Sequence, residues 1–131
     1  MKVFTNGCFD ILHRGHLELL KYCNKMACPA MGGWVIVGLN SDASIKKLKG
    51  NNRPINNQED RKFALESLKY VDKVEIFEED TPLELIKSVN PQIIVKGGDY
   101  LKEQVVGNDI CAVRIFNYLK NYSTTNILNR A

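Results

Sequence analysis

Both histidines of this chain, His13 and His16, lie in one ten-residue stretch that begins at Gly7. The stretch follows a short apolar run, Val3 and Phe4, that is typical of a strand, and leucines at helical spacing come after it. A helix N-terminus offers unpaired N–H groups and positive potential to a phosphate. Two imidazoles three residues apart would lie on the same face at that end. The stretch therefore predicts phosphate chemistry.

Phosphoryl and nucleotidyl transfer need mainly positioning and neutralisation of the charge that builds on phosphate oxygens. Gly15, between the two histidines, leaves room for a ligand against the backbone. The stretch contains neither a P-loop nor the Gly-x-Gly-x-x-Gly fingerprint. The plainer alternative is a pair of surface histidines on an ordinary helix, but the concentration of both histidines here favours function.

Strand-like and helix-like runs alternate along the chain, which predicts an α/β fold. We expect a Rossmann-like, doubly wound parallel sheet of about five strands with helices on both faces, in one domain spanning residues 1–131. The expected strands are 3–4, 34–39, 71–77, 93–95 and 113–118. The expected helices are 15–26, 58–68, one that begins near 81, and a short one after 123.

Two segments of this pattern need comment. Residues 44–57 are basic and contain Gly50 and Pro54, so we expect a mobile loop or a short helix there. In the helix expected over 58–68, Phe63, Leu65 and Leu68 form the apolar side.

Composition indicates an ordinary soluble domain with a net charge of +3. This charge suits anionic small molecules, and the absence of a long basic run gives no case for nucleic acid. No signal peptide or membrane-spanning run is predicted, so we expect a cytoplasmic protein with no membrane partner. The four cysteines form no Cys-x-x-Cys pair and are expected to be reduced thiols.

Gly7-Cys8-Phe9-Asp10 followed by His13-Arg14-Gly15-His16 resembles the signature of the cytidylyltransferase-like nucleotidyltransferases, the family with an HxGH motif. The resemblance covers nearly the whole chain. It includes Leu48-Lys49-Gly50, which is similar to the segment that brings a basic residue to the phosphates, and a C-terminal Ser123-Thr124-Thr125 motif.

Within the family, 77–82 and 95–100 are similar to the adenylyltransferase domain of the ADP-heptose synthesis enzymes. Lys69-Tyr70-Val71-Asp72 is closer to the cytidylyltransferases. The resemblance therefore implies transfer of AMP from ATP to a sugar 1-phosphate, with heptose 1-phosphate as the implied acceptor. Two alternatives stay open: a CTP-dependent enzyme acting on glycerol 3-phosphate or a similar alcohol phosphate, and a non-catalytic nucleotide-binding module.

The resemblance also implies roles for individual residues. The catalytic set is His13, His16 and Lys49. Nucleotide binding is expected at Gly7, Cys8, Phe9, Asp10, Gly15, Lys96, Gly97, Gly98, Asp99, Ser123, Thr124 and Thr125. Substrate binding is expected at Asn40, Asp42, Arg53 and Arg61.

The expected cofactor is Mg²⁺, held mainly by the nucleotide phosphates, so no side chain is assigned to it as a fixed ligand. Asp10 is a weak candidate for contact with this ion. The expected partners are ATP (or CTP) and a phosphorylated sugar or alcohol. Because small members of this family tend to form dimers, a homodimer is also expected.

Overall fold

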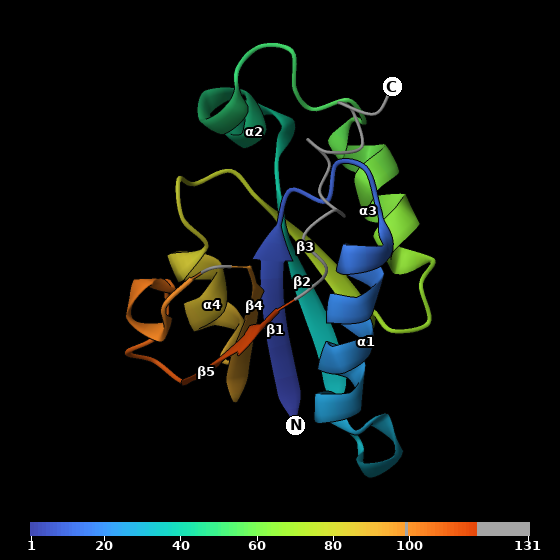
Figure 1. Cartoon of the computed structure of the whole chain (residues 1–131), viewed down its shortest axis with the longest axis vertical. Coiled ribbons are helices and arrows are strands. Elements are labelled where there is room, and N and C mark those ends of the chain that lie inside the picture. The colour runs from blue at the N-terminus through green and yellow to red at the C-terminus, as the bar shows by residue number, and fades with distance from the viewer. Residues whose placement is uncertain (99, 118–131) are drawn as a thin grey trace.

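The computed structural model describes residues 1–98 and 100–117 and contains one parallel sheet (Figure 1). Its strands are β1 (Lys2–Gly7), β2 (Trp34–Asn40), β3 (Lys73–Phe77), β4 (Ile93–Gly97) and β5 (Ala112–Phe116). They lie in the order β3-β2-β1-β4-β5, and every neighbouring pair is parallel. The predicted α/β fold with a five-stranded parallel sheet is confirmed.

Helices cover both faces of the sheet, as expected for parallel strands joined by crossovers. They are α1 (Arg14–Ala27), α2 (Asp42–Lys49), α3 (Gln58–Glu66) and α4 (Leu83–Val89), with short 3₁₀ turns at Pro29–Met31 and Lys102–Gln104. Figure 1 shows α1 and α3 on one side of the strands and α4 on the other, while α2 lies beyond the strand tips.

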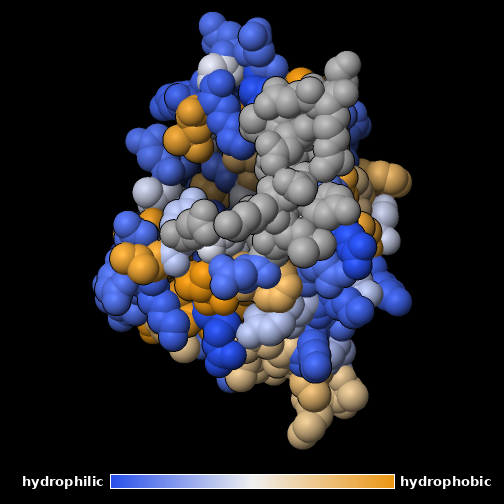
Figure 2. All heavy atoms as spheres, viewed as in Figure 1, coloured by the Kyte–Doolittle hydropathy of each residue, from blue (hydrophilic) through white to orange (hydrophobic). Residues whose placement is uncertain are grey.

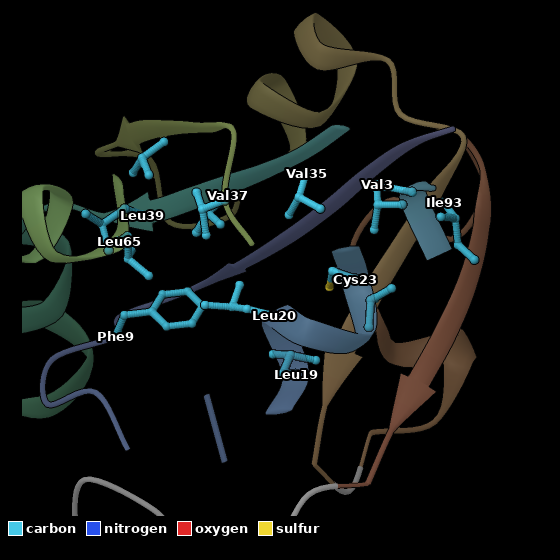
Figure 3. Packing of buried hydrophobic residues seen from close by; sticks show 14 residues of the cluster. Val3, Phe9, Leu19, Leu20, Cys23, Val35, Val37, Leu39, Leu65 and Ile93 are labelled. Atoms are coloured by element: carbon cyan, nitrogen blue, oxygen red, sulfur yellow. The ribbon is translucent and has the colours of Figure 1, made fainter. Parts of the chain in front are cut away.

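The larger of two apolar clusters lies between the sheet and helices α1 and α3 (Figure 3). Val3, Val35 and Val37 come from the sheet, and Leu20 and Leu65 come from the helices. A second cluster around Phe4, Ile36 and Ile86 packs beneath α4 on the opposite face. The central strands β1 and β2 are therefore buried on both sides, which fixes where their ends stand.

A short helix was one of the two alternatives expected over 44–57, and α2 forms its first part, up to Lys49. It begins after Ser41, whose hydroxyl accepts from the Ser44 N–H at 3.1 Å, and Ile45 anchors it in the core. Ser44 and Ile45 are its buried residues, and most of its other positions are polar. The chain from Gly50 to the start of α3 is the remaining loop.

The expectation for the apolar side of α3 was wrong at one position. Phe63 is 73% exposed, whereas Arg61 is almost fully buried beside Leu65. The inward face of this helix is therefore partly cationic.

The sheet divides at its middle. β1 pairs with β2 along six residues, but its register with β4 covers only Val3–Ile93 and Phe4–Ile94. Strand order reverses at this place, and such switch points form the ligand crevice of open parallel sheets. Toward the strand tips, Lys96 bridges the divergence by donating from Nζ to the Asn6 carbonyl at 3.3 Å.

The outer surface near the strand tips is mainly hydrophilic. Figure 2 shows blue residues over α2 and the loop after it, where Lys46, Lys47 and Lys49 stand in the last turn of the helix. In the described part of the chain, no helix is both long and apolar enough to cross a bilayer.

Candidate active site

A cavity of about 410 Å³ lies at the carboxyl ends of the strands, where the sequence places its motifs. Residues of the turn after β1, of the end of α2 and of the end of β4 meet there. Of the predicted site residues, the cavity wall includes Gly7, Cys8, Phe9, Asp10, His13, His16, Asn40, Lys49, Lys96 and Gly97. The volume is within the range of small-molecule sites.

The turn after β1 is held from inside. Phe9 adopts a positive φ of 46°, and its ring is buried in the core beside Leu20 (Figure 3). The backbone of the turn is thereby fixed, because moving it would withdraw an aromatic ring from the core. The same ring lies 5.0 Å from the His16 imidazole.

His13 is the N-cap of α1. Its Nδ1 accepts from the Gly15 N–H at 3.1 Å, so the proton of the neutral ring lies on Nε2. Burial lowers the pKa of His13 from its usual 6.5. Gly15 is buried and does not border the cavity, so the structure does not show the expected contact between Gly15 and a nucleotide.

His16 stacks on His13, with ring centroids 3.8 Å apart and planes inclined by 24°. The expectation that both imidazoles share one face is therefore confirmed. Burial lowers the pKa of His16 to about 3, the charges of His13 and Lys49 add to this, and a hydrogen bond with the Ile11 backbone opposes it. At neutral pH both imidazoles are therefore uncharged.

Lys49 and Lys96 supply positive charge at the cavity wall. Lys49 ends α2 and is exposed, while Lys96 sits at the divergence between β1 and β4. The pKa of Lys96 is lowered, because the effect of burial is larger than the opposing effect of the nearby Cys8. The wall therefore combines uncharged donors with two lysines, an arrangement suited to a polyphosphate.

Asp10 is not placed as a metal or nucleotide ligand, although it borders the cavity. Its carboxylate accepts from the N–H groups of Ile55 and Asn56, both at 2.8 Å, and pairs with Arg53 Nε at 3.2 Å. Burial alone would raise the pKa of Asp10, but these hydrogen bonds outweigh it and lower the pKa. Both oxygens are thus used to hold the loop between α2 and α3.

Arg61 also departs from its expected role. Its guanidinium is buried and is surrounded by oxygen acceptors from the protein, including Asp42 at 2.7 Å. It is not on the cavity wall, so the expectation that it binds the substrate is corrected.

Asp42 and Arg53 are likewise outside the cavity wall. Asp42 pairs with Arg61, and Arg53 pairs with Asp10. Asn40 does border the cavity, with its side chain donating to Ser44 Oγ at 3.0 Å. Of the expected substrate-binding set, the structure brings Asn40 alone to the wall.

The two glycines at the end of β4, Gly97 and Gly98, make different contacts. Gly97 borders the cavity, whereas the Gly98 N–H donates to the Phe116 carbonyl at 3.3 Å and Gly98 has a φ of 94°. The expectation that Gly98 binds the nucleotide is corrected for its N–H, which is used between strands. Asp99 and Ser123, Thr124 and Thr125 lie outside the described residues.

Sequence reasoning assigned no individual role to several cavity residues, although they lie in segments that resemble the family. Leu48, Phe77, Asp80, Pro82 and Tyr100 line the cavity along with the predicted residues. Phe77 and Asp80 could have been found from their place after β3, since the carboxyl ends of all strands share one edge.

The site does not fit a metal ion held by protein ligands alone. In residues 1–98 and 100–117, no three His, Cys, Asp or Glu side chains gather as a metal site, and the Asp10 oxygens are occupied by the contacts above. Phosphate oxygens would have to supply most of the coordination.

In proton NMR of the imidazoles, we expect the pKa of His13 to lie below its usual 6.5 and that of His16 to be about 3. The unfolded chain takes up these protons near pH 6.5, whereas the folded chain does not. The free energy of unfolding should therefore fall as the pH is lowered from about 6.5 toward 3. His16→Asn should remove most of this dependence, and titration of His16 near 6.5 would contradict the assignment.

Comparison with known proteins gives a consistent picture. The family model described as cytidylyltransferase-like matches residues 4–130. The chain is 56% identical over 129 residues to the bifunctional protein HldE of a Nitratiruptor species and 50% identical to that of Helicobacter pylori, covering 98% of this chain in each case. It spans only 27% of the length of either protein.

Among solved structures, the fold resembles the lipopolysaccharide core biosynthesis protein from Thermoplasma volcanium. The TM-score is 0.73 at 26% identity, over 94% of this chain and 98% of that one.

Proposed function

Because this chain belongs to the cytidylyltransferase-like family, we propose that it transfers AMP from ATP to a sugar 1-phosphate, giving an ADP-sugar and pyrophosphate. The observation that carries this proposal is the stacked, uncharged pair His13 and His16, with Lys49, on the wall of one cavity at the strand ends. Neutral donors and a lysine grouped in this way suit the charge of a polyphosphate in transfer.

In the proposed reaction, an oxygen of the sugar phosphate attacks the α-phosphorus of ATP in line. The bond from that phosphorus to the bridging oxygen of the β-phosphate breaks, and pyrophosphate leaves with the electron pair. The N–H donors of His13 and His16 stabilise the charge on the phosphate oxygens, and Lys49 attracts the phosphates. No covalent enzyme intermediate is required.

Heptose 1-phosphate is the proposed acceptor. Its support is the resemblance of 77–82 and 95–100 to the adenylyltransferase domain of the ADP-heptose synthesis enzymes. Both segments border the cavity, through Phe77, Asp80 and Pro82 in one and Lys96, Gly97 and Tyr100 in the other.

ATP is proposed over CTP. The segment that resembled the cytidylyltransferases, 69–72, ends at Asp72, which accepts from the Val35 N–H at 2.7 Å, near the amino end of β2. That place is at the opposite end of the strand from the cavity, so this segment has no direct influence on the base. A purine site that left one polar group unpaired with cytosine would prefer ATP roughly ten- to a hundredfold in kcat/KM.

Pyrophosphate release tests the proposal. ATP and CTP are each offered with heptose 1-phosphate, other sugar 1-phosphates and glycerol 3-phosphate. We expect release with ATP and a sugar 1-phosphate, and ATP should prevail when both nucleotides compete. CTP ahead would favour the cytidylyl alternative, and nucleotide binding without release from any pair would favour a non-catalytic module.

Magnesium is proposed to arrive on the ATP phosphates, consistent with the lack of a protein-ligated site in the described residues. Pairing of two copies is proposed from the family resemblance and is checked by the mass of the protein in solution. Residence in the cytoplasm, where ATP is available, is proposed with it.

Lys49→Ala should raise the KM for ATP or for the sugar phosphate about tenfold, because it removes a charged contact to phosphate. Binding of adenosine, which carries no phosphate, should not change. Lys47→Ala is the matched control, since Lys47 is an exposed lysine of the same helix that does not border the cavity. Equal kinetics for the two variants would remove Lys49 from the site.

A further inference from the structure

We propose that Arg61 is a positioning residue that sets where Lys49 stands relative to His13 and His16, a role that rests on the nucleotidyl transfer proposed above. Its side chain is 1% exposed and is not itself part of the cavity wall. Its guanidinium donates to four oxygens of the protein: the carbonyls of Cys8 (2.9 Å), Asn40 (2.8 Å) and Asn56 (2.9 Å), and the Asp42 carboxylate (2.7 Å).

Two of these contacts join the ends of the central strands. Nη1 donates both to Cys8, which follows β1, and to Asn40, the last residue of β2. Both residues border the cavity. One nitrogen therefore fixes the spacing between the turn that leads to the histidines and the strand that leads to α2.

The contact with Asp42 anchors the first turn of α2. The Asp42 N–H also donates to Gln58 Oε1 at 2.9 Å, so α3 holds this end of the helix by two bonds. Lys49 is the last residue of α2, seven residues further along, or about 10 Å at the rise of an α-helix. A small tilt at the anchored end is carried to the Lys49 side chain.

The loop after Lys49 is held at its far end by the same residue. Arg61 Nε donates to the Asn56 carbonyl, and the Asn56 N–H donates to Asp10. Lys49 thus stands on a segment whose two ends, at Asp42 and Asn56, are both bound by one guanidinium. Arginine suits this task because its donors spread in a fixed plane, whereas lysine has a single nitrogen.

Arg61→Lys keeps the charge and loses this geometry. Leu65→Val is the matched control, because Leu65 is buried on the same face of α3 and lies outside the cavity wall. Turnover is expressed per folded molecule, with the folded fraction taken from circular dichroism. We expect kcat/KM to fall up to tenfold in Arg61→Lys, through KM as for Lys49→Ala, and to stay within twofold in Leu65→Val.

A double-mutant cycle with Lys49→Ala separates positioning from general loosening. If Arg61 places Lys49, the roughly tenfold cost of Lys49→Ala in kcat/KM should shrink below threefold in the Arg61→Lys background. Multiplicative effects in the cycle, or equal kcat/KM for Arg61→Lys and Leu65→Val, would overturn the proposal.

Imidazole titration gives a readout that needs no turnover. The charge of Lys49 lowers the pKa of His16. Lys49→Ala as a single substitution should therefore raise the pKa of His16. When Lys49→Ala is added to Arg61→Lys, the pKa of His16 should not change. The same rise in both backgrounds would refute positioning. If the unmutated protein released no pyrophosphate from any pair, the proposed function would fail while this titration still decided the role of Arg61.

Discussion

His16→Ala should lower kcat by roughly a hundredfold or more, the scale of losing one preorganised donor in the transition state. His16 lies at the cavity wall, stacked on His13 and against the Phe9 ring, with a pKa of about 3. A neutral N–H held in this way needs no rearrangement when charge develops on a phosphate oxygen. Turnover is measured by pyrophosphate release at saturating ATP and acceptor.

His13→Ala should have an effect of the same size, but it also removes the N-cap of α1. Loss of the cap costs about 1 kcal/mol of stability, so His13→Asn, which retains a capping side chain, isolates the catalytic effect. Arg14→Ala is the control for both, because Arg14 lies between the histidines yet is exposed and pairs with Glu18. Near-normal turnover of either histidine variant would remove that residue from the proposed mechanism.

Asp10→Ala should have the largest effect on stability, a loss of about 3–5 kcal/mol in the free energy of unfolding. The Asp10 side chain is 1% exposed and that of Arg53 is 14% exposed, so removing the carboxylate leaves a buried guanidinium without its partner. The N–H groups of Ile55 and Asn56 lose their acceptor as well. Urea denaturation measures the change.

The control for this variant is Asp109→Ala, since Asp109 is an exposed aspartate and its loss should change stability by no more than about 0.5 kcal/mol. Asp10→Asn preserves the shape but not the charge, so it should fall between the two. A loss below about 1 kcal/mol in Asp10→Ala would show that the loop holds without the carboxylate.

The arrangement of strands was predictable because buried strands have a recognisable sequence pattern. The stretch from Trp34 to Leu39 and the run Ile93–Val95 are continuous and apolar, as strands covered on both faces require. The histidine turn was predictable for a related reason. It directly follows the first strand, and ligands collect at the carboxyl ends of parallel strands.

The roles of Arg61 and Asp10 were not predictable from spacing. The oxygens around Arg61 come from residues 5 to 53 positions away, and Asp10 reaches a loop some 45 residues later. Periodicity treats arginine as solvent-exposed, so it assigned the inner face of α3 to Phe63 instead. A buried charge becomes favourable only when distant acceptors converge on it, and no local pattern records that convergence.

The uneven pairing of the sheet has a consequence for its breathing motions. β3, β2 and β1 are joined by long registers, as are β4 and β5, whereas β1 and β4 share only two residue pairs. Each group of strands is well paired internally, and the two groups are joined by the short pairing between β1 and β4. Amide hydrogens of β4 and β5 should exchange with deuterium through an opening that leaves β1 and β2 protected. The boundary between β1 and β4 lies at the crevice that Lys96 bridges. A nucleotide bound there would contact both groups of strands and slow that exchange.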